Sequence, residues 1–258
     1  SLRLYDELAA DGTEFGLEHK GVLMLYKTEA GLREQVADGK AMGEFGIEAR
    51  ELTLSEISEL SPNLTVDALG GVYYPQDGHV TPMQLVPEIA RRAREMGVEV
   101  HTHTEVLAFE RSGARISRVV TTRGDFTPEE VVLTAGSWSG VLARELGLRL
   151  PIQGGKGYSI TFKRPLEAPS LPIVCGEAKI GVTPMIDALR FAGTLELAGL
   201  DLTISRQRVA AVLSGVPLYL PDLKPEGMEL VEIWRGLRPC TPDGLPFLGR
   251  ARHIDNLT

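Results

Sequence analysis

The first hundred residues contain two patterns of hydrophobic and polar positions in turn, one typical of helices and one typical of strands. Apolar residues three or four apart predict helices, and short apolar runs bounded by glycine or proline predict strands. The tetrapeptide Thr53-Leu54-Ser55-Glu56 matches a capping box and predicts the start of a short helix that ends before Pro62. The other predicted helices cover 2–8, 29–42 and the residues after Pro82, and the predicted strands lie at 21–26 and from Gly70.

The helix predicted after Pro82 has one apolar stripe, and its arginines lie mostly off that stripe. Proline suits the first turn of a helix, and the glycine at position 97 predicts where this helix ends. The stripe consists of Leu85, Ile89, Ala93 and Met96.

The middle of the chain predicts strands. Segment 98–106 alternates apolar and polar residues, and two further strands are expected at 107–110 and 116–122. The run 131–136 is apolar and ends in Ala135-Gly136, so it predicts a buried strand whose small end lets another group approach closely. A helix is expected over 139–146.

After Pro151 the pattern changes to shorter alternating runs, which predict an antiparallel sheet rather than one doubly wound sheet. The runs lie at 158–162, 180–184, 189–195 and 228–234, with a helix near 205–213. The two patterns together predict a mixed α+β fold with two intermingled regions.

Composition narrows the function classes. The 258 residues are 43% hydrophobic and 24% charged, as expected for a globular protein with a sizeable core. The net charge of −8 argues against a nucleic-acid surface, which needs clustered basic residues. No apolar run approaches the roughly 20 residues of a membrane span. Cys175 and Cys240 form no CxxC and predict free thiols in a reducing, cytoplasmic setting.

Several suggestive groups have simpler explanations. On a strand, Glu99, His101, His103 and Glu105 would share one face and could begin a zinc site, but no other His or Cys is spaced to complete it. A polar strand face is therefore expected, without a metal. His79, in a turn, is interpreted as structural.

Two further motifs are incomplete. Gly154-Gly155-Lys156-Gly157 lacks the spacing of a phosphate loop and has no Ser or Thr after the lysine. The stretch from Gly136 to Gly140 has Trp138 rather than serine at its centre, so it is no nucleophile elbow.

The segment 234–249 carries the most specific chemical signal. It reads Trp-Arg-Gly-Leu-Arg-Pro-Cys-Thr-Pro-Asp-Gly-Leu-Pro-Phe-Leu-Gly, and its prolines and glycines leave the backbone few shapes. Pro239 biases the backbone of Arg238 toward extended geometry. A rigid guanidinium fork suits a small carboxylate. A turn whose arginines face water is the alternative.

The pattern Gly-Leu-Arg-Pro-x-Thr-Pro-Asp-Gly-x-Pro-x-x-Gly resembles the C-terminal signature of the D-amino-acid oxidase-like superfamily of FAD enzymes. It is most similar in look to D-amino-acid dehydrogenases and bacterial glycine oxidases. The resemblance implies that Arg238 binds the substrate carboxylate beside the flavin, with Tyr158 and Tyr219 as walls of the substrate pocket. It also implies four positions along the FAD: Val106, Ala135, Gly136 and Trp138.

The resemblance also implies how the chain is divided. Residues 71–149 would be the middle of an FAD-binding Rossmann-like domain, and 236–258 would return to it. Residues 1–70 and the antiparallel sheet of 150–235 would form the substrate domain.

Relatives in this superfamily open with Gly-x-Gly-x-x-Gly, which holds the FAD pyrophosphate at a helix N-terminus, and that pattern is absent from the sequence. Both ends also look cut, so we expect an interior fragment of a longer enzyme that by itself is inactive and retains little or no FAD. Relatives that attach FAD covalently have a cysteine where Gly236 stands here, which predicts non-covalent FAD.

The function implied by the resemblance is oxidation of the Cα–N bond of a small amino acid, a D-amino acid or glycine, by hydride transfer to flavin. The alternative is a non-catalytic binding or assembly module that keeps the fold. The sequence does not decide whether the enzyme is an oxidase or a dehydrogenase. It also leaves open the electron acceptor, the chirality of the substrate and the oligomeric state. The cytoplasm is the expected location. The alternative for the whole enzyme is attachment to the inner face of the membrane through an electron acceptor.

Overall fold

The computed structural model describes residues 2–258 and divides the chain into two compact units. Unit 1 comprises residues 2–98, 158–194 and 204–235, and unit 2 comprises 99–157, 195–203 and 236–258. The chain passes from one unit to the other at five points, and three of them lie within long strands: β7 (Gln153–Lys163), β10 (Ala188–Glu196) and β11 (Leu230–Cys240).

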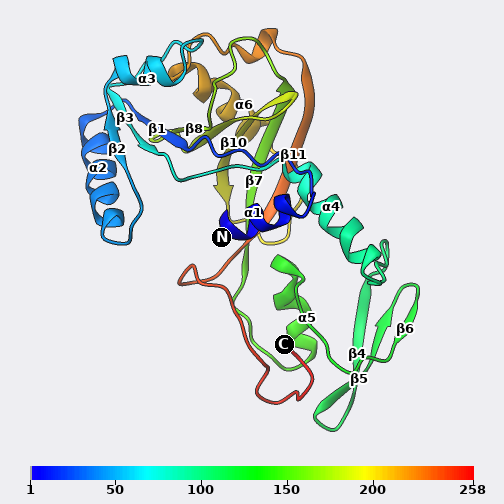
Figure 1. Cartoon of the computed structure of the whole chain (residues 1–258). Coiled ribbons are helices and arrows are strands. Elements are labelled where there is room, and N and C mark those ends of the chain that lie inside the picture. Colours follow the sequence, from blue (N-terminus) through cyan, green and yellow to red (C-terminus); the bar gives the residue numbers. More distant parts are fainter. Residues whose placement is uncertain (1) are drawn as a thin grey trace. The chain divides into compact units, whose positions relative to one another are not determined.

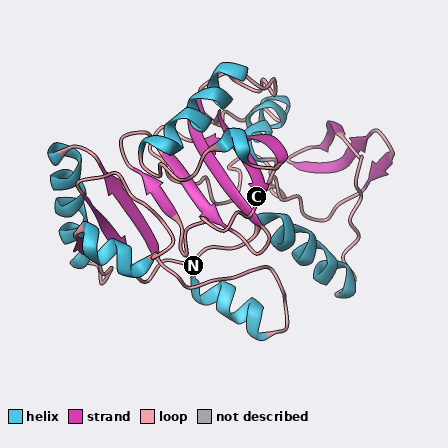
Figure 2. Ribbon diagram, turned by 90° about the horizontal axis from the view of Figure 1, so that it is seen from above, coloured by secondary structure: helices cyan, strands magenta, loops and turns pink. Residues whose placement is uncertain are grey.

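An eight-stranded sheet, in the order β11-β7-β10-β9-β8-β1-β3-β2, organises unit 1. Figure 1 labels its elements along the chain, and Figure 2 shows the strands side by side with helices packed along them. The remaining strands are β1 (Val22–Tyr26), β2 (Arg50–Leu52), β3 (Gly70–Tyr74), β8 (Ile173–Cys175) and β9 (Ile180–Pro184). The helices of this unit are α1 (Leu2–Ala10), α2 (Glu29–Gly43), α3 (Leu54–Leu60), α4 (Pro82–Glu95) and α6 (Arg206–Gly215), with short 3-10 turns at Val216–Leu218 and Pro225–Gly227.

Strand pairing confirms the predicted, mostly antiparallel sheet. β1 pairs antiparallel with β3, and β9 pairs antiparallel with both β8 and β10. The exception is the parallel pair of β1 with β8, in which Leu23 lies opposite Ile173. The sequence pattern missed β2 and β8, because each has only three residues and so shows little alternation.

The core of unit 1 lies on one face of this sheet. Side chains alternate across a strand, so every second residue of β7 and β10 faces inward. Helix α6 supplies Val209 and Val212 to the same core. The inward residues of the two strands are Tyr158, Ile160, Phe162, Leu189 and Phe191, each no more than 3% exposed.

Local signals place the helix starts. The capping box at α3 is present: the Thr53 backbone N–H donates to Glu56 Oε2 at 2.8 Å, and the Glu56 N–H donates to Thr53 Oγ1 at 3.4 Å. Pro82 occupies the first turn of α4, and Gly97 follows that helix with a φ of +90°. The predicted apolar stripe of α4 is only partly used within the chain, since Leu85 is buried whereas Met96 is 85% exposed.

Glu177 joins the start of α2 to the rest of unit 1. Its carboxylate accepts hydrogen bonds from the Thr28 backbone N–H and hydroxyl at 2.9 and 2.8 Å, and from the Tyr219 hydroxyl at 2.6 Å. Burial by itself would raise the pKa of Glu177, but the hydrogen bonds from Tyr219 and Thr28 outweigh it and hold the pKa at about 2.

This lowered pKa predicts a pH-dependent stability. The contribution of Glu177 is complete above its ordinary pKa of 4.5 and is lost as pH falls toward about 2. We expect Glu177→Gln to lower the thermal midpoint of unit 1 at pH 6 and to flatten its decline between pH 5 and 2. Glu226→Gln, at an exposed turn, is the control and should change neither the thermal midpoint at pH 6 nor its decline between pH 5 and 2. An unchanged pH profile in Glu177→Gln would contradict the assignment.

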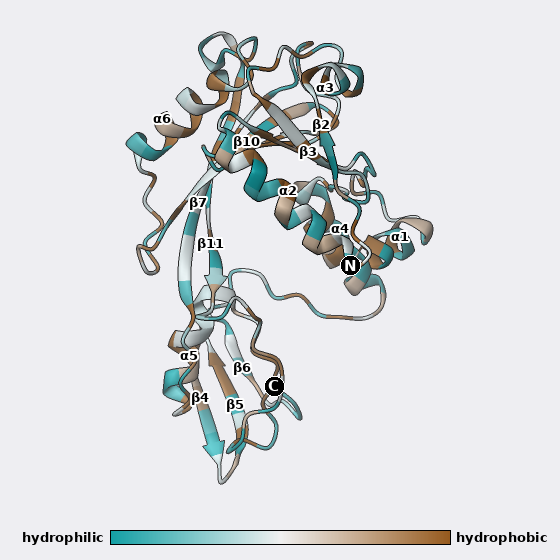
Figure 3. Ribbon diagram, turned by 90° about the vertical axis from the view of Figure 1, so that its left-hand side faces the viewer, coloured by the Kyte–Doolittle hydropathy of each residue, from teal (hydrophilic) through white to brown (hydrophobic). Residues whose placement is uncertain are grey.

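Unit 2 contains a three-stranded antiparallel meander and a small core. The meander consists of β4 (Val106–Ser112), β5 (Arg115–Thr121) and β6 (Gly124–Phe126). Figure 3 shows the hydrophobic stretch of β5, whose Ile116 packs with Leu146, Ile254 and Leu257. A 3-10 turn at Gly136–Trp138 leads into α5 (Ser139–Glu145), as predicted for the helix.

The end of the chain is fixed by the fully buried Asn256. Its side-chain oxygen accepts from the Ile116 N–H at 2.8 Å, and its amide donates to the carbonyl oxygens of Ile116 and Glu129 at 3.0 and 3.2 Å. Val131 and Leu257 form a parallel bridge beside it. The last residues thus form no strand and are held by this bridge and the bonds around it.

Two predicted strands are wrong. Residues 98–105 form no strand, and His103 has a φ of +55°, so the four polar residues at 99–105 share no strand face. Residues 132–135 are also irregular, and Val132 is 65% exposed rather than buried. A strand needs a continuous ladder of hydrogen bonds, and these segments make only scattered ones: Val131 and Leu133 donate to Asn256 and Thr258, and the Glu105 carbonyl oxygen accepts from Thr122.

The predicted boundary between residues 70 and 71 falls inside β3, and residues 71–98 belong to unit 1. The pairing of β3 with β1 explains this, because it ties the segment to the large sheet. Both cysteines are free, as predicted, and burial with the nearby Glu177 charge raises the pKa of the Cys175 thiol to about 12. Within the described part of the chain, no helix combines the length and apolar character of a membrane span.

Candidate active site

Arg238 lies on β11, where the following proline holds the backbone extended, as predicted. Its side chain is exposed. Among residues 2–258, no carboxylate lies within 4.0 Å of its guanidinium. The Cys240 thiol donates to the Arg238 carbonyl oxygen at 3.5 Å, a local contact that leaves the guanidinium untouched. All the donors of this guanidinium are therefore available to an anion.

Two glycines of β7 let the strand with Arg238 and a neighbouring loop approach closely. A Cβ at Gly154 would lie 2.5 Å from the Gly199 carbonyl oxygen and 3.5 Å from the Leu237 side chain. A Cβ at Gly155 would lie 2.6 Å from Leu195 Cδ1 and 2.8 Å from Cys240 Sγ. Any larger residue would displace one of these segments, so the glycines serve close packing and not phosphate binding.

Lys156, the next residue, is 1% exposed and ion-paired. Its Nζ donates to Asp201 Oδ2 at 2.6 Å and to the Thr203 carbonyl oxygen at 3.1 Å, and Glu196 Oε1 lies 3.7 Å away. The bond from Lys156, with two from Thr203, lowers the pKa of Asp201 to about 2. This ion pair fixes the loop of residues 195–203, and the local sequence offered no sign of it because its members lie some 45 residues apart.

We expect Asp201→Asn to loosen that loop, because the variant leaves the buried Lys156 charge with weaker compensation. Limited proteolysis should cut within 195–203 faster than in the parent protein. Asp187→Asn, at an exposed turn, is the control and should leave the cleavage rate unchanged. Equal cleavage in both variants would show that the ion pair does not hold the loop.

The turn Ala135-Gly136-Ser137-Trp138 is tied to the strand of Arg238. The Ser137 hydroxyl donates to the Leu237 carbonyl oxygen at 3.3 Å, which places the turn beside the residue that precedes Arg238. Gly136 has a φ of +55°, and a Cβ there would meet nothing within 4 Å. Trp138 is 43% exposed. The turn therefore presents bare backbone and an aromatic ring to open space.

Val106, the other predicted cofactor contact, begins β4 and pairs with Thr121. It is half-buried and belongs to unit 2, like Ala135, Gly136, Trp138 and Arg238. The structure thus gathers the four predicted cofactor residues and the predicted carboxylate residue in one unit. Their roles toward a ligand stay predictions.

A cavity of about 550 Å³ lies in unit 2, and part of its wall consists of residues that follow Arg238 in the sequence. Leu133, Leu148 and Ile152 line it, together with Pro239 and Phe247 of the proline-rich segment. Its lining is mostly apolar, which suits a group with a large nonpolar surface. The sequence did not indicate this cavity, because its walls come from two segments, 133–152 and 239–258, that are distant in the sequence.

Tyr158 and Tyr219 do not occupy pocket-wall positions within this chain. They are 2% and 3% exposed and belong to the core of unit 1. The Tyr158 hydroxyl accepts from the Ser205 N–H at 3.3 Å, and the Tyr219 hydroxyl donates to Glu177. Their burial argues against the prediction that they contact a substrate, since both the rings and the hydroxyl groups already have internal partners.

The histidines interpreted as structural from the sequence make internal contacts. His101 is bonded to Glu99 at 3.0 Å and packs edge-on against Phe126, and no three metal-binding side chains come together in the described chain. His79 is mostly buried beside Glu18, and burial lowers its pKa.

Comparison with known proteins supports the resemblance seen in the motif. The chain is 31% identical to a D-amino acid dehydrogenase of Vibrio atlanticus, an alignment that covers 96% of this chain and 59% of that protein. It spans about three fifths of the length of the curated relatives it matches.

Solved structures show the same fold. A glycine oxidase from Geobacillus kaustophilus superposes with a TM-score of 0.89 at 28% identity, covering 99% of this chain and 68% of that one. An L-proline dehydrogenase from P. horikoshii superposes with a TM-score of 0.86 over 99% of this chain and 69% of that one, and its 19% identity shows the fold alone. A family model described as FAD dependent oxidoreductase (DAO) matches residues 1–258, and the chain belongs to that family.

Proposed function

We propose that the whole protein oxidises the Cα–N bond of a small amino acid, a D-amino acid or glycine, and that Arg238 binds its α-carboxylate. The observation that carries this proposal is the exposed Arg238 guanidinium, which has no carboxylate partner among the described residues and lies on a strand with a fixed backbone. A planar fork with free donors binds a carboxylate in a bidentate manner.

The named relatives support the substrate class. The matching sequences are called D-amino acid dehydrogenases, and two well-superposing structures at 25% and 28% identity are glycine oxidases. Both names denote the oxidation of a small amino acid. Because the chain corresponds to only part of those proteins, their activity enters here as a proposal for the whole protein.

The residues present fit FAD. The open space beside Gly136 admits a planar group close to the backbone, and the exposed ring of Trp138 offers it a surface for stacking. We propose that these two residues, with Val106 and Ala135, hold the cofactor without a covalent bond. When bound, FAD supplies the acceptor for the hydride that leaves Cα.

The task of this chain's residues is then binding and orientation. Arg238 neutralises and aligns the carboxylate through the planar fork of its guanidinium. The Ser137–Leu237 bond, the two β7 glycines and the Lys156–Asp201 pair hold the segments around Arg238. Such positioning supplies much of the rate in reactions that need a near-attack geometry.

The experiment that tests the function is anaerobic bleaching of the flavin in the whole protein. A panel of D-amino acids, their L-forms, glycine and proline analogues is added, and flavin absorbance is followed. Bleaching by a subset of amino acids is expected. If none of them reduces the flavin, the proposal fails and a non-catalytic binding or assembly module becomes the better description.

For the 258-residue chain by itself we expect little or no bound FAD, because the sequence contains no Gly-x-Gly-x-x-Gly to hold a pyrophosphate. The measurement is the ratio of absorbance at 450 and 280 nm after dialysis. A yellow protein with one FAD per chain would contradict this expectation.

A further inference from the structure

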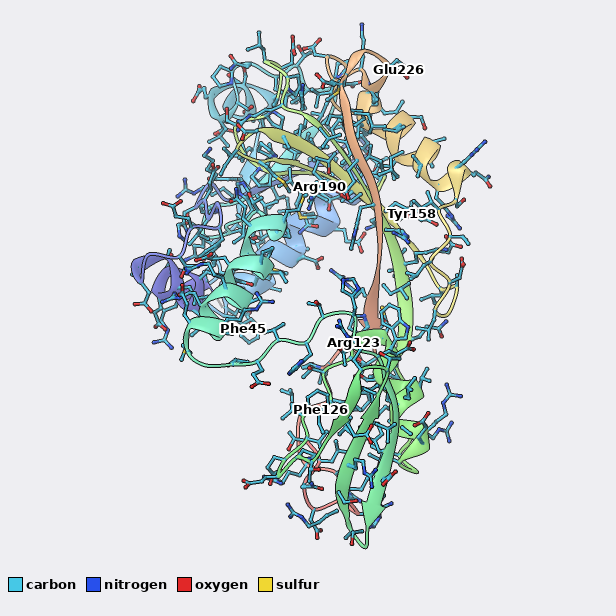
Figure 4. All side chains as sticks on the ribbon, turned by 90° about the vertical axis from the view of Figure 1, so that its right-hand side faces the viewer. Phe45, Arg123, Phe126, Tyr158, Arg190 and Glu226 are labelled. Carbon is cyan, nitrogen blue, oxygen red and sulfur yellow. The ribbon has the colours of Figure 1, made fainter. Side chains whose placement is uncertain are left out.

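The sheet face opposite the core of unit 1 carries an unusual set of polar residues. β7 and β10 are neighbours in the sheet, and each alternates between the two faces. Tyr158 and Phe191 face the core, so Ser159 and Thr161 of β7 and Arg190 of β10 lie on the opposite face. Figure 4 shows Arg190 and Tyr158 on opposite sides of the strands.

Arg190 is half-buried and lacks an acidic partner. Its Nε donates to Thr161 Oγ1 at 3.4 Å, a long hydrogen bond, and no carboxylate in residues 2–258 comes within 4.0 Å of the guanidinium. Burial lowers the pKa of Arg190, and the charge of Glu232 on β11 only partly opposes this. A partly desolvated guanidinium with unused donors is costly for a protein to keep without a function.

The second observation is independent of the arginine. Ser159 is only 7% exposed, and its hydroxyl oxygen is fully buried. This oxygen has no hydrogen-bond partner in the described structure. It lies two residues from Thr161 on the same face of β7. Buried hydroxyl groups are nearly always satisfied, so an exception indicates a group that binds there.

The register across β10 adds one more hydroxyl group. Arg190 lies opposite Thr183 of β9 in an antiparallel pair, and residues opposite each other share a face. The guanidinium thus contacts Thr161 on one neighbouring strand, and Thr183 lies opposite Arg190 on the other. The Arg190 guanidinium and the neighbouring hydroxyl groups can donate hydrogen bonds to an anion. A set with one positive charge suits an anion with one negative charge.

We propose that Arg190, with Ser159, Thr161 and Thr183, forms a subsite in unit 1 for the carboxylate of a small molecule. Planar, bidentate recognition suits a carboxylate. The nearby negative charge of Glu232 disfavours a dianion such as phosphate, because like charges repel in a partly buried site. Arg190 belongs to unit 1 and Arg238 to unit 2, and the test of this subsite requires no turnover.

The test is a titration of the 258-residue chain with sodium acetate at constant ionic strength, followed by the arginine Nε–H signals in ¹H–¹⁵N NMR. The Arg190 signal is assigned by its loss in Arg190→Met. We expect a saturable shift of that signal in the millimolar range, and none with sodium chloride. Ser159→Ala should weaken acetate binding by about three- to tenfold, and Glu232→Gln should strengthen it by about the same factor.

Two matched variants make the result specific. Arg206→Met removes an exposed arginine of unit 1 and should leave the titration unchanged. Arg238→Met should also leave the Arg190 shift unchanged, so failure of the Arg238 proposal and failure of this one can be told apart. A non-saturating shift equal to that with chloride would overturn the subsite, and so would binding that survives in Arg190→Met.

Discussion

Arg238→Met in the whole protein should lower kcat/KM for amino-acid substrates by about 30- to 1,000-fold. This range corresponds to about 2–4 kcal/mol for a shielded guanidinium–carboxylate pair. The loss should fall mainly on KM, since the interaction is made with the bound substrate before the transition state. FAD content should stay the same, because the predicted cofactor residues are different ones. The measurement is steady-state kinetics beside the flavin spectrum.

Two comparisons separate a carboxylate contact from a structural role. Arg238→Lys keeps the charge but loses the planar fork, so it should also weaken selection for α-carboxylates, though less than methionine does. Amines that lack a carboxylate never use the contact, and their poorer turnover should change little. If Arg238→Met slows amino acids and simple amines equally, Arg238 is structural and the assignment is wrong.

Phe191→Ala should destabilise unit 1 by about 3–5 kcal/mol. Phe191 is 0% exposed and lies 5.3 Å, ring centre to ring centre, from Phe162 on the neighbouring strand. The variant removes buried apolar surface and leaves a cavity that a paired β-strand cannot easily fill. The measurement is chemical unfolding followed by the fluorescence of Trp234, which belongs to unit 1, in a Trp138→Phe background.

The matched control is Phe45→Ala, since Phe45 is in the same unit and 83% exposed. Its free energy of unfolding should stay within about 0.5 kcal/mol of the parent. A loss for Phe191→Ala no larger than that for Phe45→Ala would show that the face defined by Leu189 and Phe191 is not the core of unit 1.

Elements with local signals could be predicted from the sequence. The capping box at Thr53, the helix stop at Gly97 and the extended backbone before Pro239 all depend on residues a few positions apart. The alternation at 158–162 and 189–195 likewise predicted strands, which the structure has as parts of β7 and β10. Arg238 could be named for the same reason, because its motif is contiguous.

The site around Arg238 was only partly predictable. The resemblance predicted that Ala135 and Gly136 contact the cofactor, but the Ser137–Leu237 bond that ties their turn to the strand of Arg238 joins residues 100 positions apart. Tyr158 and Tyr219 were assigned to a pocket wall from the family resemblance, and the fold buries both in unit 1. A side chain's surroundings follow from the packing of distant segments, which the sequence does not display.

By itself the sequence determined the helices, most strands of the large sheet, the mixed α+β class and the motif that contains Arg238. Tertiary structure alone decided that 98–105 is not a strand, that Lys156 is buried against Asp201, and that Arg190 has no carboxylate partner among the described residues. The physical reason is the range of the interactions. Backbone preference and side-chain periodicity act over a few residues, whereas strand pairing, ion pairing and burial depend on which remote segments the fold brings into contact.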